Sequence, residues 1–119
     1  MTTCNEEGEL IMRMDQDKIV TLHPDPAKSG VRIDRWKYDL VRRGILVAIP
    51  RRAEGLPFRE LPAALRRIIP RGELQRLGSL TWYTATVKLD LEARGEIERV
   101  PGVQPQRLRR VAGARRMKA

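Results

Sequence analysis

The sequence has little of what most catalytic and metal sites require. Its 119 residues include one cysteine, Cys4, and one histidine, His23. A lone cysteine cannot form a disulfide within the chain, and one cysteine with one histidine cannot complete a zinc site. The usual sets of general bases and nucleophiles are also missing, and no phosphate-cradling glycine loop is visible. We therefore expect a protein that is not an enzyme and that needs neither a metal nor a cofactor.

Long apolar runs are absent as well. The sequence contains neither a membrane-length apolar stretch of about 18 residues nor the apolar core of a signal peptide, so we expect a cytoplasmic protein. Apolar residues make up 41% and charged residues 33% of the chain, which is typical of a folded domain rather than a disordered one. A chain of this length can form a single hydrophobic core but not two ordinary domains.

Positive charge, by contrast, is abundant and unevenly distributed. The formal net charge is +9, which favours a polyanionic partner. Residues 5–17 contain five acids and one arginine, whereas residues 99–119 contain seven bases and no acid. We expect an acidic, partly disordered arm over residues 1–17 and a basic, disordered tail over residues 112–119.

The spacing of apolar residues predicts three helices between these two ends. Asp34 is a good N-cap for the first helix, and Pro50 follows its end. Pro62 is compatible with the second helix because it would lie in the first turn. Residues 70–78 are predicted to be a connection. The predicted helices span residues 34–49, 59–69 and 79–95, the third starting at Ser79 or Thr81 and ending at Gly95.

Strand composition marks the segments around these helices, so the predicted fold class is α+β. Residues 18–22 form a predicted strand within an extension that reaches residue 33. Residues 56–58 form a short extended piece, and residues 96–100 and 106–111 are two strands joined by a proline-containing loop. The residues expected to be buried together are Tyr38, Val41, Ile45, Leu61, Leu65, Ile68, Val87, Leu91 and Ile97.

The third predicted helix has three distinct faces. Leu80, Tyr83, Val87 and Leu91 lie on one apolar face, which is sufficient to dock the helix on the core. A roughly opposed polar face contains Thr81, Thr84, Ala85, Lys88 and Glu92. A second apolar patch contains Trp82, Leu89 and Ala93, and it needs a cover, either from the N-terminal strand or from a partner subunit. Because the strand at residues 18–22 also needs a pairing edge, we expect a homodimer.

Residues 34–111 resemble the winged helix-turn-helix domains of bacterial transcriptional regulators. The segment LDLEARGEIERV, residues 89–100, looks like the end of a recognition helix that runs into the first wing strand. The segment GLPFRELPAAL, residues 55–65, is similar to the short strand and second helix of that fold. The chain also resembles a group of small bacterial proteins of unknown function that share WYTATVKLDLEARGEIERVPG followed by PQRLR. The resemblance implies a winged-helix domain, with a three-helix core and a C-terminal β-hairpin wing.

The same resemblance implies a surface that binds double-stranded DNA. The recognition helix would present Ser79, Thr81, Thr84, Ala85 and Lys88. The wing would present Arg99, Arg107, Arg109 and Arg110, either to phosphates or simply to solvent as a charged hairpin.

Two interpretations of function remain open at this point. One is a small transcriptional regulator or nucleoid-type DNA-binding protein, and the alternative is a winged-helix module that docks an acidic protein partner. Asp90 and Glu92 are expected to be surface charges beside Lys88 and Arg94 in either case.

Overall fold

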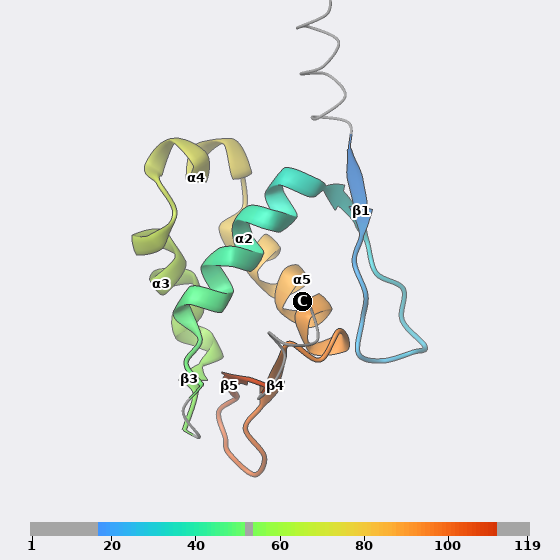
Figure 1. The fold of residues 1–119 in the computed structure, drawn as a ribbon, viewed down its shortest axis with the longest axis vertical. Helices are drawn as coiled ribbons and strands as arrows, with labels where there is room; N and C mark the ends of the chain where they lie inside the picture. Colours follow the sequence, from blue (N-terminus) through green and yellow to red (C-terminus); the bar gives the residue numbers. More distant parts are fainter. Residues whose placement is uncertain (1–16, 52–53, 112–119) are drawn as a thin grey trace, which may run out of the picture.

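The computed structural model describes residues 17–51 and 54–111, so almost all of the predicted arm and the whole predicted tail lie outside the described residues. The described chain is α+β, with four α-helices and two small antiparallel sheets, of two and three strands. Figure 1 shows the helices packed together, with one sheet at the upper right of the bundle and the other below it. This arrangement is compatible with a winged-helix-like small domain.

The first sheet lies in the N-terminal extension. Strand β1 (Lys18–Val20) pairs antiparallel with β2 (Arg32–Asp34), with Ile19 opposite Ile33. The predicted strand is therefore confirmed, and it finds its pairing edge within the chain. The Asp34 side chain forms an ion pair with Lys18 instead of capping the following helix. Asp34 thus occupies the N-cap position as predicted, but without a side-chain cap.

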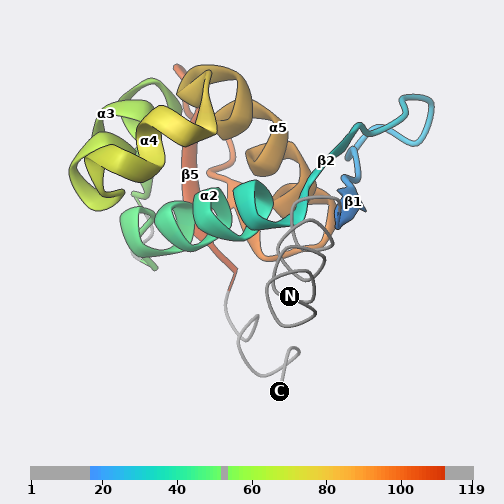
Figure 2. The ribbon, with the colours of Figure 1, turned by 90° about the horizontal axis from the view of Figure 1, so that it is seen from above.

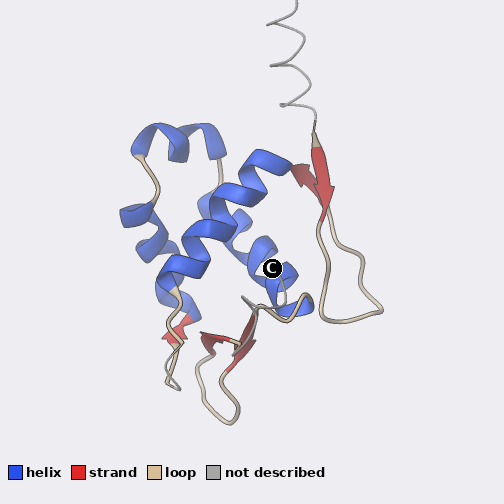
Figure 3. Ribbon diagram, in the orientation of Figure 1, coloured by secondary structure: helices blue, strands red, loops and turns tan. Residues whose placement is uncertain are grey.

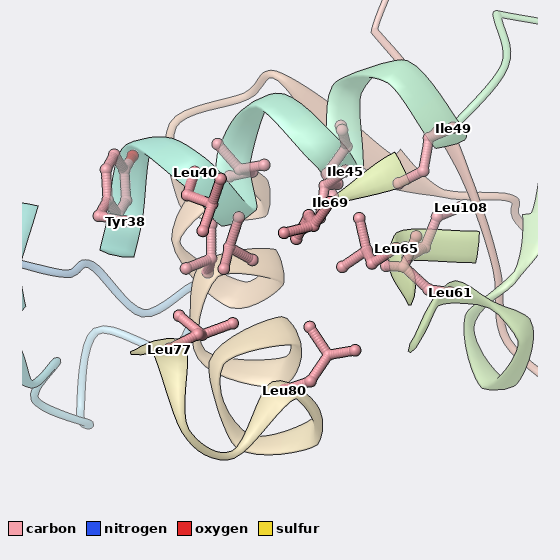
Figure 4. Close-up of a cluster of buried hydrophobic side chains, with 14 of the residues drawn as sticks. Tyr38, Leu40, Ile45, Ile49, Leu61, Leu65, Ile69, Leu77, Leu80 and Leu108 are labelled. Carbon is pink, nitrogen blue, oxygen red and sulfur yellow. The ribbon is translucent and has the colours of Figure 1, made fainter. Parts of the chain in front are cut away.

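The helical core is built around α2 (Arg35–Ala48), which packs against both α3 (Leu61–Ile68) and α5 (Leu80–Ala93). Figure 4 shows the buried side chains that these helices direct toward one another. The helical spacing of the apolar residues explains this packing, since it places them along one side of each helix. Eight of the nine residues expected in the core are buried: Tyr38, Val41, Ile45, Leu61, Leu65, Val87, Leu91 and Ile97.

Ile68 is the exception, and the prediction for it was wrong. Its side chain is 39% exposed, whereas that of the adjacent Ile69 is buried in the core. The helix ends between the two residues, because Ile69 has extended backbone angles while its amide still bonds to the carbonyl of Leu65. Helical spacing does not apply beyond this point, so Ile69 takes the inward position.

The predicted connection at residues 70–78 was also wrong, because it contains a fourth helix, α4 (Arg71–Leu77). Pro70 occupies the N-cap position, and Gly78, at φ +94°, ends the helix. Leu77 is buried and Leu74 packs against the core. This helix has only seven residues, and two of its apolar side chains contact the core. It is therefore too short to show a helical repeat of apolar residues in the sequence.

The second sheet contains the predicted wing. Its strand order is β3 (Leu56–Pro57), β5 (Arg107–Arg110), β4 (Ile97–Arg99), and all pairs are antiparallel. Gly55, at φ +64°, precedes β3, and a Cβ atom there would lie 2.4 Å from the carbonyl oxygen of Leu108. Only glycine fits this close approach of two backbones. Figure 3 shows the strands of this sheet below the helices, apart from the two-stranded β1–β2 sheet at the upper right.

Candidate nucleic-acid interface

The helix expected to read DNA, α5, begins as predicted. Ser79 is its N-cap, and its Oγ accepts a hydrogen bond from the Trp82 amide at 3.2 Å. Ser79 and Thr81 are exposed, and Ala85 is half-buried. Trp82 is 46% exposed, so the N-terminal strand does not cover it. The exposed part of the predicted reading surface is therefore confined to the first turn of the helix.

Thr84 and Lys88, by contrast, are buried, so the expectation that they lie on an exposed reading face was wrong. The Lys88 Nζ lies 2.7 Å from Oε2 of Glu92 and 5.1 Å from the centroid of the Phe58 ring. Desolvation lowers the pKa of Lys88, while the neighbouring Glu92 carboxylate raises it. Phe58 belongs to the short 3-10 helix η1 (Phe58–Glu60), which thus covers this side of α5. Sequence periodicity could not show that a second element covers the polar face.

Asp90 is fully buried, so its prediction as a surface charge was also wrong. One carboxylate oxygen accepts the backbone amide of Leu22 at 2.8 Å. The other accepts the Arg94 Nε at 2.9 Å and the Tyr38 hydroxyl. Burial, together with this hydrogen bond to Asp90, raises the pKa of Tyr38. Asp90 therefore joins the N-terminal extension, α2 and α5 at one point in the core.

Glu92 is nearly buried too, and it connects α5 to the wing. Its Oε1 accepts the Arg99 Nε at 3.0 Å, while its Oε2 faces Lys88. The Arg99 side chain nevertheless remains 59% exposed. Arg109, on the neighbouring strand, pairs with Glu98, and the atoms Nε and Oε2 are 2.5 Å apart. These two wing arginines thus have intrachain partners, although parts of both side chains still reach solvent.

The remaining two wing arginines hold the sheet to the loop before it. Arg107 donates from Nε to the carbonyl of Glu54 at 2.6 Å and from Nη2 to that of Gly55 at 3.2 Å. Arg110 donates from Nε to the carbonyl of Ile49 at 3.0 Å. Both side chains are only half-exposed. Arg107 and Arg110 therefore stabilise the packing of the sheet against this loop, whether or not they also contact a ligand.

A cluster of aromatic rings and cations joins α2, α4 and α5. The Lys37 Nζ lies 5.6 Å from the Trp36 ring centroid and 5.2 Å from that of Tyr83. The Arg76 guanidinium lies 4.6 Å from Trp36, and the Trp82 ring meets Tyr83 edge-on at 4.8 Å. Each such cation–ring contact contributes roughly 0.5–1 kcal/mol at an exposed site. The cluster therefore stabilises the packing of three helices at the surface.

The described part of the chain contains neither a metal-binding cluster nor a membrane-spanning helix. Within residues 17–51 and 54–111, no group of three histidine, cysteine or acidic side chains is placed to hold a metal ion. No helix in those ranges is both long enough and apolar enough to cross a membrane.

Comparison with known proteins places the chain in a family. No curated protein and no solved structure matches it. A family model does match, described as "Family of unknown function (DUF6958)", and it covers residues 18–108. The matched region includes the N-terminal sheet, the four helices, β3, β4 and the start of β5. The chain therefore belongs to this family of unknown function, DUF6958.

Proposed function

We propose that the chain is a non-enzymatic protein that binds duplex DNA, either as a small transcriptional regulator or as a nucleoid-type binder. The observation that carries the proposal is the excess of positive charge, +9 overall, on a fold compatible with a winged helix. Lys and Arg side chains neutralise phosphates and release condensed counterions, which supplies most non-specific affinity for DNA. The three core helices α2, α3 and α5, with the short α4 between the last two, are followed by a β-hairpin, and this order supports the proposal further.

Because Thr84 and Lys88 are buried, fewer side chains of α5 can contact DNA bases. Most bidentate base contacts come from Arg, Lys, Asn or Gln side chains that reach a groove, and a buried lysine cannot do so. The exposed hydroxyls of Ser79 and Thr81 suit contacts with phosphates, which position a protein but do not read sequence. Binding with little sequence preference, as by a nucleoid-type protein, is therefore the favoured form of the proposal.

A salt titration tests the proposed function. The full chain should bind a short random-sequence duplex, and log K should fall linearly with log salt, by about 0.9 for each phosphate contacted. Fluorescence anisotropy from about 50 to about 200 mM salt measures this slope, since affinity for duplex DNA changes strongly over that range. A duplex of unrelated sequence serves as the control for sequence preference. No saturable binding even at the lowest salt would rule out the proposal.

The exposed apolar surface of α5 favours a second candidate, a winged-helix module that docks an acidic protein partner. Trp82 is 46% exposed, and Leu89 and Ala93 are half-buried around the same helix. Aromatic side chains at the centre of a docking surface often carry much of the binding energy. A chain that binds an acidic protein but shows no salt-dependent binding to duplex DNA would support this candidate over the first.

The same surface motivates the expectation of a homodimer. If the patch around Trp82 is covered by a second copy, Trp82→Lys should shift the chain to the monomer, because a charged side chain cannot be buried unpaired there. Light scattering over a concentration series measures the mass. Val47→Lys is the matched control, since Val47 is an exposed apolar residue on another helix, at 66% exposure. A monomeric mass for the unmodified chain at high concentration would contradict the expectation.

A further inference from the structure

The exposed positive charge of the described chain is concentrated away from α5 and the wing. The segment from η1 to α4 contains five arginines and two glutamates. Figures 1 and 2 both place α3 and α4 next to each other, on the opposite side of the molecule from the β1–β2 sheet. Arg76 of this region is exposed too, but its guanidinium lies over the Trp36 ring. We refer to the other four exposed arginines, Arg59, Arg66, Arg67 and Arg71, as the α3–α4 arginines.

Two of these arginines, Arg66 and Arg67, lie in the last turn of α3, and Arg59 lies in η1, immediately before α3. Arg66 and Arg67 are consecutive, so they lie on neighbouring positions of the same side of α3. The opposite face carries Leu61 and Leu65, which are fully buried in the core. The arginines therefore point away from the protein, and all are exposed. The eight residues of α3 extend over roughly 12 Å, at 1.5 Å per residue.

The surface continues from α3 onto α4. Arg71 is also exposed, and it follows Arg67 after the bend at residues 68–70. Ala63, which is exposed between Arg59 and Arg66, has no long side chain to keep a ligand at a distance. Duplex DNA carries one negative charge for about every 1.7 Å of its axis, so a face of this length spans several phosphates.

The α3–α4 arginines also differ from Arg99 and Arg109 of the wing in having no carboxylate partner among the described residues. Within residues 17–51 and 54–111, no carboxylate lies within ion-pair distance of Arg59, Arg66, Arg67 or Arg71. Arg99 and Arg109, by contrast, are paired with carboxylates. A partnerless arginine can give all five of its N–H donors to phosphate oxygens without first breaking an ion pair.

The carboxylates of the same region do not cancel this charge. Glu73 lines the groove between α2 and the α3–α4 bend, together with Arg43. Glu60 is exposed beside Arg59, and it is the only other acid between Phe58 and Leu77. The outer surface of α3 and α4 therefore keeps a net positive charge.

We propose that the α3–α4 arginines hold the phosphate backbone of duplex DNA and supply more of its binding than exposed cations on other segments of the chain do. This inference rests on the proposed function and names the surface that contacts the DNA. Guanidinium groups bind phosphate oxygens in bidentate pairs, so exposed arginines on the consecutive helices η1, α3 and α4 are well suited to a regularly charged backbone.

The test compares two triple variants of the full chain that remove the same charge. The first is Arg66→Gln, Arg67→Gln and Arg71→Gln, which keeps side chains that favour helix. The control is Lys28→Gln, Arg32→Gln and Arg51→Gln, because these cations are exposed and lie on other segments of the chain. Circular dichroism and the urea midpoint should be unchanged in both variants, since no buried side chain is altered.

The measurement is anisotropy with a short random-sequence duplex over a salt series. We expect the first variant to bind about tenfold or more weakly at low salt and to flatten the salt slope by roughly 2–3 units, about one for each arginine that no longer binds a phosphate. The control should weaken much less. Equal weakening in both variants, or wild-type affinity in the first, would overturn the inference and leave the proposed function standing. Absence of binding by the unmodified chain would instead overturn the proposed function, and the inference with it.

Discussion

Replacing Asp90 with alanine is expected to lower the free energy of unfolding by about 2–4 kcal/mol, one of the two largest effects that we predict for a single substitution. The buried carboxylate accepts hydrogen bonds from the Leu22 amide, the Tyr38 hydroxyl and the Arg94 guanidinium. Alanine leaves the part-buried Leu22 amide and the buried Tyr38 hydroxyl without their acceptor. Each buried donor that is left unsatisfied costs about 1–3 kcal/mol.

Urea unfolding followed by circular dichroism measures this loss. Asp39→Ala is the matched control, because Asp39 is an exposed aspartate whose side chain makes no ion pair among the described residues. Its effect should stay within about 0.5 kcal/mol. Tyr38→Phe should give an intermediate loss, since it removes one of the three donors. If Asp90→Ala unfolds at the same urea concentration as Asp39→Ala, Asp90 does not anchor the N-terminal extension.

Replacing Glu92 with alanine is expected to destabilise the fold by about 3 kcal/mol at neutral pH, and this loss should shrink as the pH rises. Glu92 is the carboxylate paired with the buried Lys88, and it also accepts from Arg99. Without Glu92, Lys88 remains as a buried charge with no counter-ion. Breaking a buried ion pair by removing one partner is costly for this reason.

The pH dependence follows from the direction of the Lys88 pKa. Burial already lowers this pKa from its usual value, and the Glu92 carboxylate opposes the effect, so the variant should have a still lower folded-state pKa. Between that pKa and the unfolded value of about 10.4, the unfolded chain binds more protons than the folded one. The stability of the variant therefore rises with pH across this window, with a slope of at most about 1.4 kcal/mol per pH unit.

Urea unfolding of the variant and the unmodified chain at pH 7 and near the unfolded pKa of about 10.4 measures this difference. Adding Lys88→Met to the Glu92→Ala variant is the control, because it replaces the orphaned charge with an apolar side chain of similar length. The double variant should recover most of the stability at neutral pH and lose the pH dependence. If Glu92→Ala lowers the free energy of unfolding equally at both pH values, the charge of Lys88 is not the cause of that loss.

The helices that could be predicted from the sequence are those with long apolar stripes or clear end signals. The stripe from Tyr38 to Ile49 defines α2, and Ser79 and Gly95 mark the ends of α5, as the structure confirms. Short elements gave weaker signals. Helix α4 has only Leu74 and Leu77 as apolar anchors, and neither makes a repeating pattern over seven residues.

The local pattern of residues in the sequence did not reveal which charged side chains are buried. Lys88 and Glu92 look like the polar side of a surface helix, and Asp90 looks like a surface charge, because helical periodicity describes only one element at a time. In the structure, η1 covers Lys88, the N-terminal extension reaches Asp90, and the wing supplies a partner for Glu92. Each of these contacts joins residues from segments that are distant in the sequence or belong to different elements.

By itself, the sequence determined the fold class, the ends of the main helices, the strands of the wing and the net positive charge, because these depend on composition and short-range spacing. Only the tertiary structure decided which charges are available to a ligand. Wing arginines that stand clear of acids in the sequence have carboxylate or carbonyl partners, as Arg109 and Arg107 do. Arginines that look like ordinary helix surface, such as Arg66 and Arg67, face outward and have no described carboxylate partner. The physical reason is that pairing and burial depend on distance in space, which residue spacing along one chain does not specify.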